Sequence, residues 1–252
     1  MIRRPPRSTQ SRSSAASDVY KRQVCFCIPT TTNKRDWKTI EETDLWRVLM
    51  ASLEKFTPQH EITLFIGYNE TDKVFSQDEE RMKPEAIFQN FKIKWFPFNE
   101  KYRGKPTWIW NDLARSAIDD GFDYLKILGC DIRMPNDRDW LSCFINKLKK
   151  NDNIGWVAGW SGNDQIPTQF LVHKTHFEIF NFIYPPQIHA WFCDDFLAKI
   201  YPKKYAIWLR SYPLLNVGGE PRYNPKDDAK LCEMLLRRYK PCLNRFLQDI
   251  DK

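Results

Sequence analysis

A single aspartate after a short apolar run is the first candidate for chemistry. Residues 124–128 read Tyr-Leu-Lys-Ile-Leu, and this length and content predict a buried central strand. Asp131 follows almost directly, in Gly-Cys-Asp. In an open α/β sheet, ligands bind at the carboxyl ends of the strands. A carboxylate there can hold a divalent cation that neutralises a diphosphate. The alternative is an aspartate that only begins a turn.

An acidic pair and a histidine pair are the next candidates. Asp194 and Asp195 precede the apolar residues 196–198, a pattern that predicts an N-cap followed by an acid in the first helical turn. Acids at that place stabilise a helix start without any catalytic role, so both interpretations stay open. His173 and His176 lie three positions apart. His173 is a candidate metal ligand, whereas the apolar neighbours of both histidines favour a structural role.

Polar residues also follow the first two predicted strands. Thr30 and Thr31 come after the apolar run 24–28, where hydroxyls and free backbone amides can receive a nucleotide. Asp72 lies in the turn after residues 62–66 and can accept hydrogen bonds from a ribose or a base. The same residue types are also common in solvated turns.

Basic side chains in two later loops could hold phosphate. Arg103 and Lys105 lie in one loop, and Arg222 follows Gly218-Gly219 in another. Such side chains can neutralise a leaving diphosphate.

The elements that must position these residues alternate between strand and helix patterns. The expected strands are 24–28, 62–66, 91–96, 124–128 and 154–160, and the expected helices are 37–56, 108–120 and 139–150. This alternation predicts one α/β domain over residues 24–252, with a mostly parallel central sheet and helices on both faces. Trp191, beside the acidic pair, can stack on a sugar ring or merely pack.

The order of these features resembles nucleotide-sugar-dependent glycosyltransferases of GT-A type. The resemblance is carried by residues 105–111, Ala117, residues 121–124 and the strand that ends in Asp131. Residues 168–176 and the later run 191–196 resemble an acceptor-side segment that is followed by an acidic pair on a helix. The resemblance covers roughly residues 24–223 and implies a GT-A, Rossmann-like fold.

The resemblance implies a role for each candidate. Asp195, with Asp194 second, would be the general base that deprotonates an acceptor hydroxyl. Asp131 and His173 would hold Mn²⁺ or Mg²⁺. The donor is expected to be a uridine diphosphate sugar, and it would contact Thr30, Thr31, Asp72, Arg103, Lys105, Asn111 and Arg222. A glycan or other hydroxyl acceptor would contact Gln169 and Trp191.

One departure bears on activity. The Asp-x-Asp or Asp-Asp of such enzymes reads Gly129-Cys130-Asp131 here, so one of the usual carboxylates is replaced and metal affinity is expected to fall. Two alternatives therefore stay open. One is a catalytically silent relative that binds a sugar nucleotide or a glycan. The other is a sugar nucleotidyltransferase, although no Gly-rich basic loop follows the first strand.

The first 23 residues differ from the rest in composition. They are rich in Ser and Arg, carry a net charge of +5, and resemble translated sequencing-adapter read-through more than a transit peptide. We expect this leader to be extraneous and the true amino terminus to be missing. Without it the charge falls from +7 to about +2, so we expect no nucleic-acid partner.

The sequence does not identify the compartment, and both a secretory-pathway (Golgi) lumen and the cytoplasm stay open. The seven cysteines have no zinc-like spacing. Asn69-Glu70-Thr71 is a glycosylation sequon, which matters only in a secretory lumen. No apolar stretch approaches the roughly 18 residues that a membrane span needs, so we expect no transmembrane segment.

Overall fold

The computed structural model describes residues 24–56, 61–137 and 139–250. The leader, residues 1–23, lies outside the described residues. The strands are β1 (Val24–Pro29), β2 (Ile62–Asn69), β3 (Phe91–Phe98), β4 (Tyr124–Ile127), β5 (Ile132–Arg133), β6 (Trp156–Trp160), β7 (Leu171–His173), β8 (Ala206–Pro213) and β9 (Leu215–Asn216). The α-helices are α1 (Ala51–Phe56), α2 (Asp78–Ile87), α3 (Pro106–Asp119), α4 (Trp140–Lys149), α5 (Thr175–Phe180), α6 (Cys193–Ile200) and α7 (Ala229–Ile250). Shorter helical turns are η1 (Ile40–Glu42), η2 (Leu45–Met50), η3 (Glu100–Tyr102) and η4 (Lys203–Tyr205).

The described strands form a seven-stranded sheet and a small two-stranded one. The large sheet has the order β3-β2-β1-β4-β7-β6-β8, and β5 pairs with β9. The half β3-β2-β1-β4 is entirely parallel. β7 runs antiparallel to both of its neighbours, while β6 and β8 are parallel to each other. The sheet is therefore mostly parallel, as predicted, and the segments after β1, β2, β3, β4 and β6 meet at one edge.

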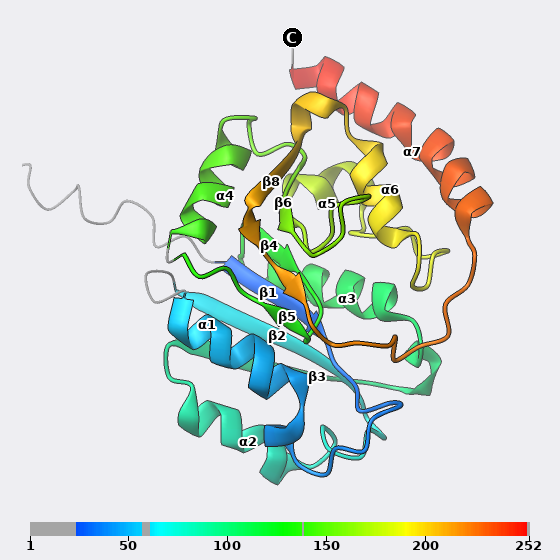
Figure 1. Ribbon diagram of the computed structural model, residues 1–252. Helices are drawn as coiled ribbons and strands as arrows, with labels where there is room; N and C mark the ends of the chain where they lie inside the picture. The colour runs from blue at the N-terminus through cyan, green and yellow to red at the C-terminus, as the bar shows by residue number, and fades with distance from the viewer. Residues whose placement is uncertain (1–23, 57–60, 138, 251–252) are drawn as a thin grey trace, which may run out of the picture.

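Helices cover both faces of this sheet (Figure 1), which confirms the predicted α/β fold. One face carries α1, α2 and α4, and the other carries α3, α5, α6 and α7. Each face has its own apolar core, because successive side chains of a strand point to opposite faces. In β1, Cys25 and Cys27 join one core, whereas Val24, Phe26 and Ile28 join the other.

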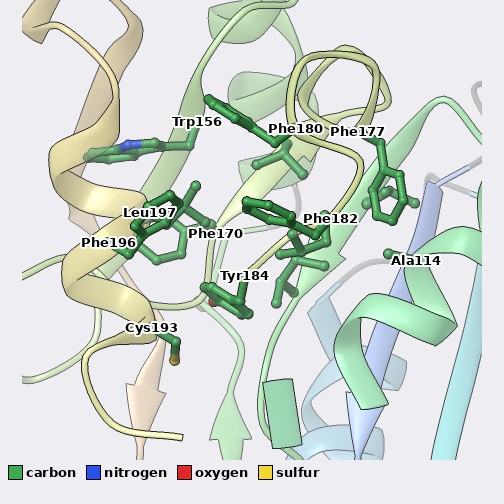
Figure 2. Close-up of a cluster of buried hydrophobic side chains, with 14 of the residues drawn as sticks. Ala114, Trp156, Phe170, Phe177, Phe180, Phe182, Tyr184, Cys193, Phe196 and Leu197 are labelled. Atoms are coloured by element: carbon green, nitrogen blue, oxygen red, sulfur yellow. The ribbon is translucent and has the colours of Figure 1, made fainter. Parts of the chain in front are cut away.

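The core on the α6 face is rich in aromatic side chains (Figure 2). Phe196 and Leu197 of α6 reach into a group that includes Phe170, Phe182 and Tyr184. Phe182 and Phe196 lie with ring centroids 6.1 Å apart. These contacts fix the first turn of α6, and with it the acidic pair, relative to the sheet.

The helix expected over residues 37–56 is broken in the structure. It consists of η1, the π-helical η2 and α1 in succession. Thr43 has extended backbone angles and closes η1, with its Oγ1 donating to the carbonyl of Ile40 at 2.6 Å. Apolar spacing could not reveal this interruption, because the interruption depends on one side-chain hydrogen bond. The break places Asp44 at the start of η2.

Within the described residues, no helix combines the length and the apolar character needed to cross a membrane.

Candidate functional site

A cleft of about 800 Å³ lies at the carboxyl edge of the parallel strands. Its walls come from the segments that follow five strands of the sheet. These segments contribute residues 30–36 after β1, residues 71–73 after β2, residues 102–106 after β3, residues 129–131 after β4, and Ser161 and Asn163 after β6. The start of α6 and the loop around residues 219–223 complete the wall. This is the edge at which open α/β sheets bind ligands.

The loop after β1 is shaped by Asp72, which lies in the turn after β2. Both carboxylate oxygens of Asp72 accept hydrogen bonds, and the backbone N–H of Thr32 donates at 2.7 Å. The backbone N–H groups of Val74 and Phe75 each donate to Oδ1 at 3.1 Å, and the hydroxyl of Thr31 donates to Oδ2 at 3.2 Å. Asp72 lines the cleft but is only 6% exposed. Its oxygens are engaged within the protein, so we interpret Asp72 as a positioning residue rather than a direct partner of a ribose.

The end of β4 places Asp131 in the cleft wall, as predicted from its position after the strand. The backbone of Asp131 accepts a hydrogen bond from the N–H of Val217 at 3.1 Å, directly beside the β5–β9 pair. A Cβ on Gly218 would lie 2.0 Å from Oδ2 of Asp131, so a side chain there would displace the carboxylate. Glycine at position 218 therefore permits the close approach that holds Asp131.

Arg222 is the cation beside Asp131. Its Nη1 lies 3.6 Å from Oδ2 of Asp131 and donates to Sγ of Cys130 at 3.0 Å. Its Nη2 forms an ion pair with Asp44 at the start of η2. The guanidinium also lies over the ring of Trp37, with Cζ 5.2 Å from the ring centroid. Arg222 thus joins three segments far apart in the sequence.

The loop that carries Arg222 is held across the cleft edge by residues 33–35. Arg35 donates to the carbonyl of Gly218 at 2.7 Å and to that of Glu220 at 2.8 Å. Asn33 donates to the carbonyl of Arg222, and Lys34 donates to Oδ1 of Asn224 at 3.0 Å. The structure therefore brings Thr30, Thr31, Asp131 and Arg222 to one wall.

The first turn of α6 presents Asp194 to the cleft. Phe192 is the N-cap and has a left-handed backbone with φ 68°, so the predicted cap at Asp194 is wrong: both acids lie inside the first turn. The hydroxyl of Tyr184 donates to Oδ1 of Asp194 at 3.2 Å. Burial raises the pKa of the Asp194 carboxyl to about 7, the Tyr184 hydrogen bond opposes this rise, and the neighbouring Asp195 adds to it. A carboxyl with this pKa can exchange a proton near neutral pH.

Asp195 does not line the cleft. Its Oδ1 forms an ion pair at 2.7 Å with Lys199, one turn further along α6. Adjacent helical residues point about 100° apart, so only one of the two acids can face the cleft. This placement corrects the preference for Asp195 over Asp194 as the candidate base.

Asn111 supports Tyr184 and does not line the cleft. Its Oδ1 accepts hydrogen bonds from the backbone N–H groups of Ile183 and Tyr184, each at 2.9 Å. Its Nδ2 donates to the carbonyl of Tyr184 at 2.8 Å. We therefore replace the predicted donor contact of Asn111 with a positioning role for the segment that bears Tyr184.

Four other predicted residues reach the cleft wall, namely Arg103, Lys105, Gln169 and Trp191. Oε1 of Gln169 accepts from the backbone N–H of Gly129 at 3.0 Å, so this side chain also supports the turn that leads to Asp131. Trp191 is 46% exposed and can offer a ring face to a ligand. Arg103 forms an ion pair with Glu100 at 2.9 Å, and Nζ of Lys105 lies 3.8 Å from the ring centroid of Trp108.

His173 lies at the other edge of the sheet, which corrects its prediction as a metal ligand. It pairs in register with Tyr124, the first residue of β4, whereas Asp131 follows the last residue of that strand. Its Nδ1 is hydrogen-bonded to the hydroxyl of Thr175 at 2.7 Å. Nδ1 of the buried His176 is hydrogen-bonded to the hydroxyl of Tyr201 at 2.8 Å, so both histidines have structural partners.

The donor set at the end of β4 does not fit a resident Mn²⁺ or Mg²⁺. No group of three His, Cys, Asp or Glu side chains suited to a metal ion occurs among residues 24–56, 61–137 and 139–250. Asp131 already has the guanidinium of Arg222 beside it. Burial raises the pKa of the Cys130 thiol, and a protonated thiol is a poor ligand. We therefore derive no chemical step through a metal.

Sequence reasoning missed two partners of the candidate residues. Asp44 pairs with Arg222 across 178 positions, and Tyr184 bonds to Asp194 from a loop without regular periodicity. No spacing in a single sequence could indicate either contact. Arg222 itself could be selected from the sequence, because it lies in a loop that begins with two glycines.

No family model matches this chain, and no curated protein matches it in sequence. Solved structures do resemble it. S. aureus TarS (residues 1–349, in complex with UDP-GlcNAc) is 12% identical, with a TM-score of 0.57, over 85% of this chain and 65% of the TarS chain. The mannosyltransferase PcManGT from Pyrobaculum calidifontis, in complex with GDP-Man and Mn²⁺, is 12% identical, with a TM-score of 0.54, over 93% of this chain and 66% of that one.

A longer TarS structure matches with a TM-score of 0.56, and this chain spans 39% of its length. At such low identity the likeness concerns the fold. This likeness agrees with the predicted GT-A, Rossmann-like fold. It carries no information on the roles of individual residues.

Proposed function

We propose that this chain is a glycosyltransferase that moves a sugar from a nucleoside-diphosphate sugar to an acceptor hydroxyl. One observation carries the proposal: the cleft at the carboxyl edge of the sheet is lined both by Asp131 with Arg222 and by Asp194 with a pKa of about 7. The guanidinium of Arg222 suits a diphosphate, and Asp194 suits proton transfer from a hydroxyl. The solved complexes of similar fold contain UDP-GlcNAc and GDP-Man, and a uridine donor is the first to test.

In an inverting reaction the residues would act as follows. Asp194 takes the proton of the acceptor hydroxyl while that oxygen bonds to the anomeric carbon of the donor. The bond between this carbon and the diphosphate oxygen breaks, and the diphosphate leaves with the electron pair. Arg222 stabilises the charge that develops on the leaving group. Thr30 and Thr31 supply polar groups beside the nucleotide, and Trp191 offers a stacking surface for a sugar.

A second candidate function is sugar-nucleotide binding without transfer. The segment Gly129-Cys130-Asp131 favours this reading, because it has only one of the two carboxylates of the resembling enzymes. The sugar nucleotidyltransferase alternative gains no support, since residues 30–36 after β1 contain no glycine to form a phosphate-cradling loop.

Release of nucleoside diphosphate from UDP-GlcNAc, UDP-glucose and GDP-mannose would separate these functions. Water can act as the acceptor, so the true acceptor need not be known. Calorimetric binding of the same donors is measured in parallel. Binding with release supports a transferase, and binding without release supports the silent relative. A protein that binds none of the donors and releases no nucleotide would contradict both.

A further inference from the structure

We infer that Arg222 is the resident cation for the donor's diphosphate, so that donor binding requires no divalent metal. This inference rests on the proposed function, and it assigns to one side chain the charge that the sequence led us to expect from Mn²⁺ or Mg²⁺. The observations that carry it are the placement of Arg222 between two carboxylates, its burial, and an N–H donor left unused.

Arg222 occupies the position at which a strand-end metal would act. Its guanidinium lies between Asp131 at the end of β4 and Asp44 at the start of η2, in contact with both. A divalent cation bound to Asp131 would face a fixed positive charge, so the two would repel each other. Burial disfavours the charge on the guanidinium, but Cys130, Asp131 and Asp44 together raise its pKa above the ordinary value, so the charge is kept. Asp131 therefore cannot gain a metal ion through deprotonation of Arg222.

The burial of Arg222 fits a fixed role rather than a mobile surface charge. Its side chain is 10% exposed, although arginine is rarely buried without partners. Trp37 lies beneath the guanidinium, and Arg35 and Asn33 bind the backbone of the loop that carries it. A side chain held in this way is pre-organised for a ligand and loses little entropy on binding.

One donor of Arg222 is unused. Its Nε–H is buried and has no hydrogen-bond partner, which normally costs free energy. Arginine offers its donors in a planar fork that matches phosphate oxygens. The hydrogen-bond donors of Arg222 are therefore not all satisfied within the protein.

The local charge is consistent with an anionic ligand when no metal is present. Cys130 places a thiol beside the guanidinium, and burial raises the pKa of this thiol above its usual value. In the described part of the chain, six basic side chains line the cleft against five acidic ones; the basic residues are Lys34, Arg35, Lys73, Arg103, Lys105 and Arg222, and the acidic ones are Asp36, Asp72, Asp131, Asp194 and Glu220. Asp44 pairs with Arg222 from outside the lining and makes the two numbers equal. The raised pKa of Asp194, about 7, removes part of its negative charge near neutral pH, which leaves a small positive excess for a diphosphate.

The test is calorimetric titration of UDP, with GDP and ADP as comparators, into the full chain. Each titration is run in excess chelator and again in excess Mn²⁺. We expect the wild type to bind its preferred nucleoside diphosphate equally in both conditions. Binding that appears only with Mn²⁺ would overturn the inference and leave the proposed function intact. A protein that binds no nucleoside diphosphate in either condition overturns the proposed function and this inference with it.

Three variants test Arg222 itself. Arg222→Met should weaken binding by about 10- to 100-fold, the cost of losing a charge-assisted hydrogen bond. Arg222→Lys keeps the charge but loses the fork and should fall between Met and the wild type. Arg222→Met leaves Asp44 without its partner, so the double variant with Asp44→Asn serves where the single variant does not fold. Arg210→Met, which removes an exposed arginine paired with Asp164, is the matched control and should bind as the wild type does. Variants at position 222 that fold and bind normally without metal would overturn the inference.

Discussion

Two aspartates face the same cleft in opposite surroundings. Asp131 has the guanidinium of Arg222 at 3.6 Å and a glycine against its carboxylate. Asp194 has a neutral phenol, Tyr184, at 3.2 Å and a second carboxylate, Asp195, as its neighbour in the chain. A carboxylate beside a cation can hold that cation in place, whereas a buried carboxylate beside a neutral group is suited to proton exchange. The chemical role of each aspartate therefore depends on its surroundings more than on its position after a strand or in a helix.

The two ends of the cleft are not independent. The pKa of Tyr223 is raised, chiefly by burial, and both Asp194 and Asp131 add to the rise. Both carboxylates also line the same cleft. A transfer reaction needs such an arrangement, since the base must reach the hydroxyl that attacks a donor held by its diphosphate.

The difference between the two aspartates should have a large effect on the pH dependence of turnover. Only the ionised Asp194 can accept a proton, so the rate of nucleotide release should rise with pH through about 7. Below that pKa the ionised fraction, and with it the rate, should fall about tenfold per pH unit. Initial rates measured across this range check the prediction. A rate that stays level well below pH 7 would show that Asp194 is not the base.

A third carboxylate of the cleft, Asp72, should behave differently from both. In Asp72→Ala, the N–H groups of Thr32, Val74 and Phe75 lose their acceptor. Each buried donor without a partner costs about 1–3 kcal/mol, so the free energy of unfolding should fall by at least about 2 kcal/mol in urea titrations. Asp78→Ala, which removes a carboxylate that is 85% exposed, is the control and should cost less than about 1 kcal/mol. Equal losses in the two variants would refute the positioning role of Asp72.

A smaller effect is expected on the way the free energy of unfolding depends on pH. The folded protein keeps a proton on Asp194 up to about pH 7, whereas the unfolded chain releases it near the ordinary value of 3.8. The folded state binds more protons in this window, so Asp194 makes stability fall as pH rises through it. The histidines act with the opposite sign, since burial lowers the pKa of His176 to about 4, and their contribution rises with pH.

Comparing wild type with Asp194→Asn isolates the aspartate from the histidines. Relative to the wild type, the variant should gain stability between about pH 5 and about pH 8, because it has no carboxyl to titrate. Urea unfolding at both pH values measures this gain. If the free energy of unfolding depended on pH in the same way in both proteins, the raised pKa of Asp194 would be contradicted.

The smallest expected effect lies outside the cleft. Deleting residues 1–23 should leave the melting temperature and donor binding unchanged, because a polar leader of this composition buries little apolar surface. Thermal denaturation of the full and shortened chains checks this. A fall of several degrees on deletion would show that the leader belongs to the fold.

The parallel half of the sheet was predictable from sequence. β1, β2, β3 and β4 are apolar runs with clear ends, and their ends alone placed Thr30, Asp72 and Asp131 at one edge. These placements need only strand direction, which the alternation with helices supplies. Ten of the thirteen predicted site residues line the cleft, and six of them lie in the segments that follow these four strands.

The other half of the site depends on contacts that periodicity does not encode. Asp194 and Asp195 share one helical turn, and the rotation of α6 is set by Phe196 and Leu197 in the aromatic core. His173 was misplaced because β7 is antiparallel, so the order of residues along it runs away from the cleft. Asp44 pairs with Arg222 from the start of η2, directly after the interruption at Thr43.

The most direct test of the account is the effect of Asp194→Asn on donor hydrolysis and donor affinity, measured side by side with Asp195→Asn. Asparagine keeps the shape of the side chain but cannot accept the proton, and loss of a general base typically costs about 10²–10⁴-fold in rate. We predict that, at a pH well above 7, Asp194→Asn loses turnover by this factor and keeps the donor Kd of the wild type. Asp195→Asn breaks an ion pair with Lys199 and removes a charge that raises the pKa of Asp194, so at that pH it changes neither. Full turnover in Asp194→Asn, or an equal loss in both variants, would contradict the account.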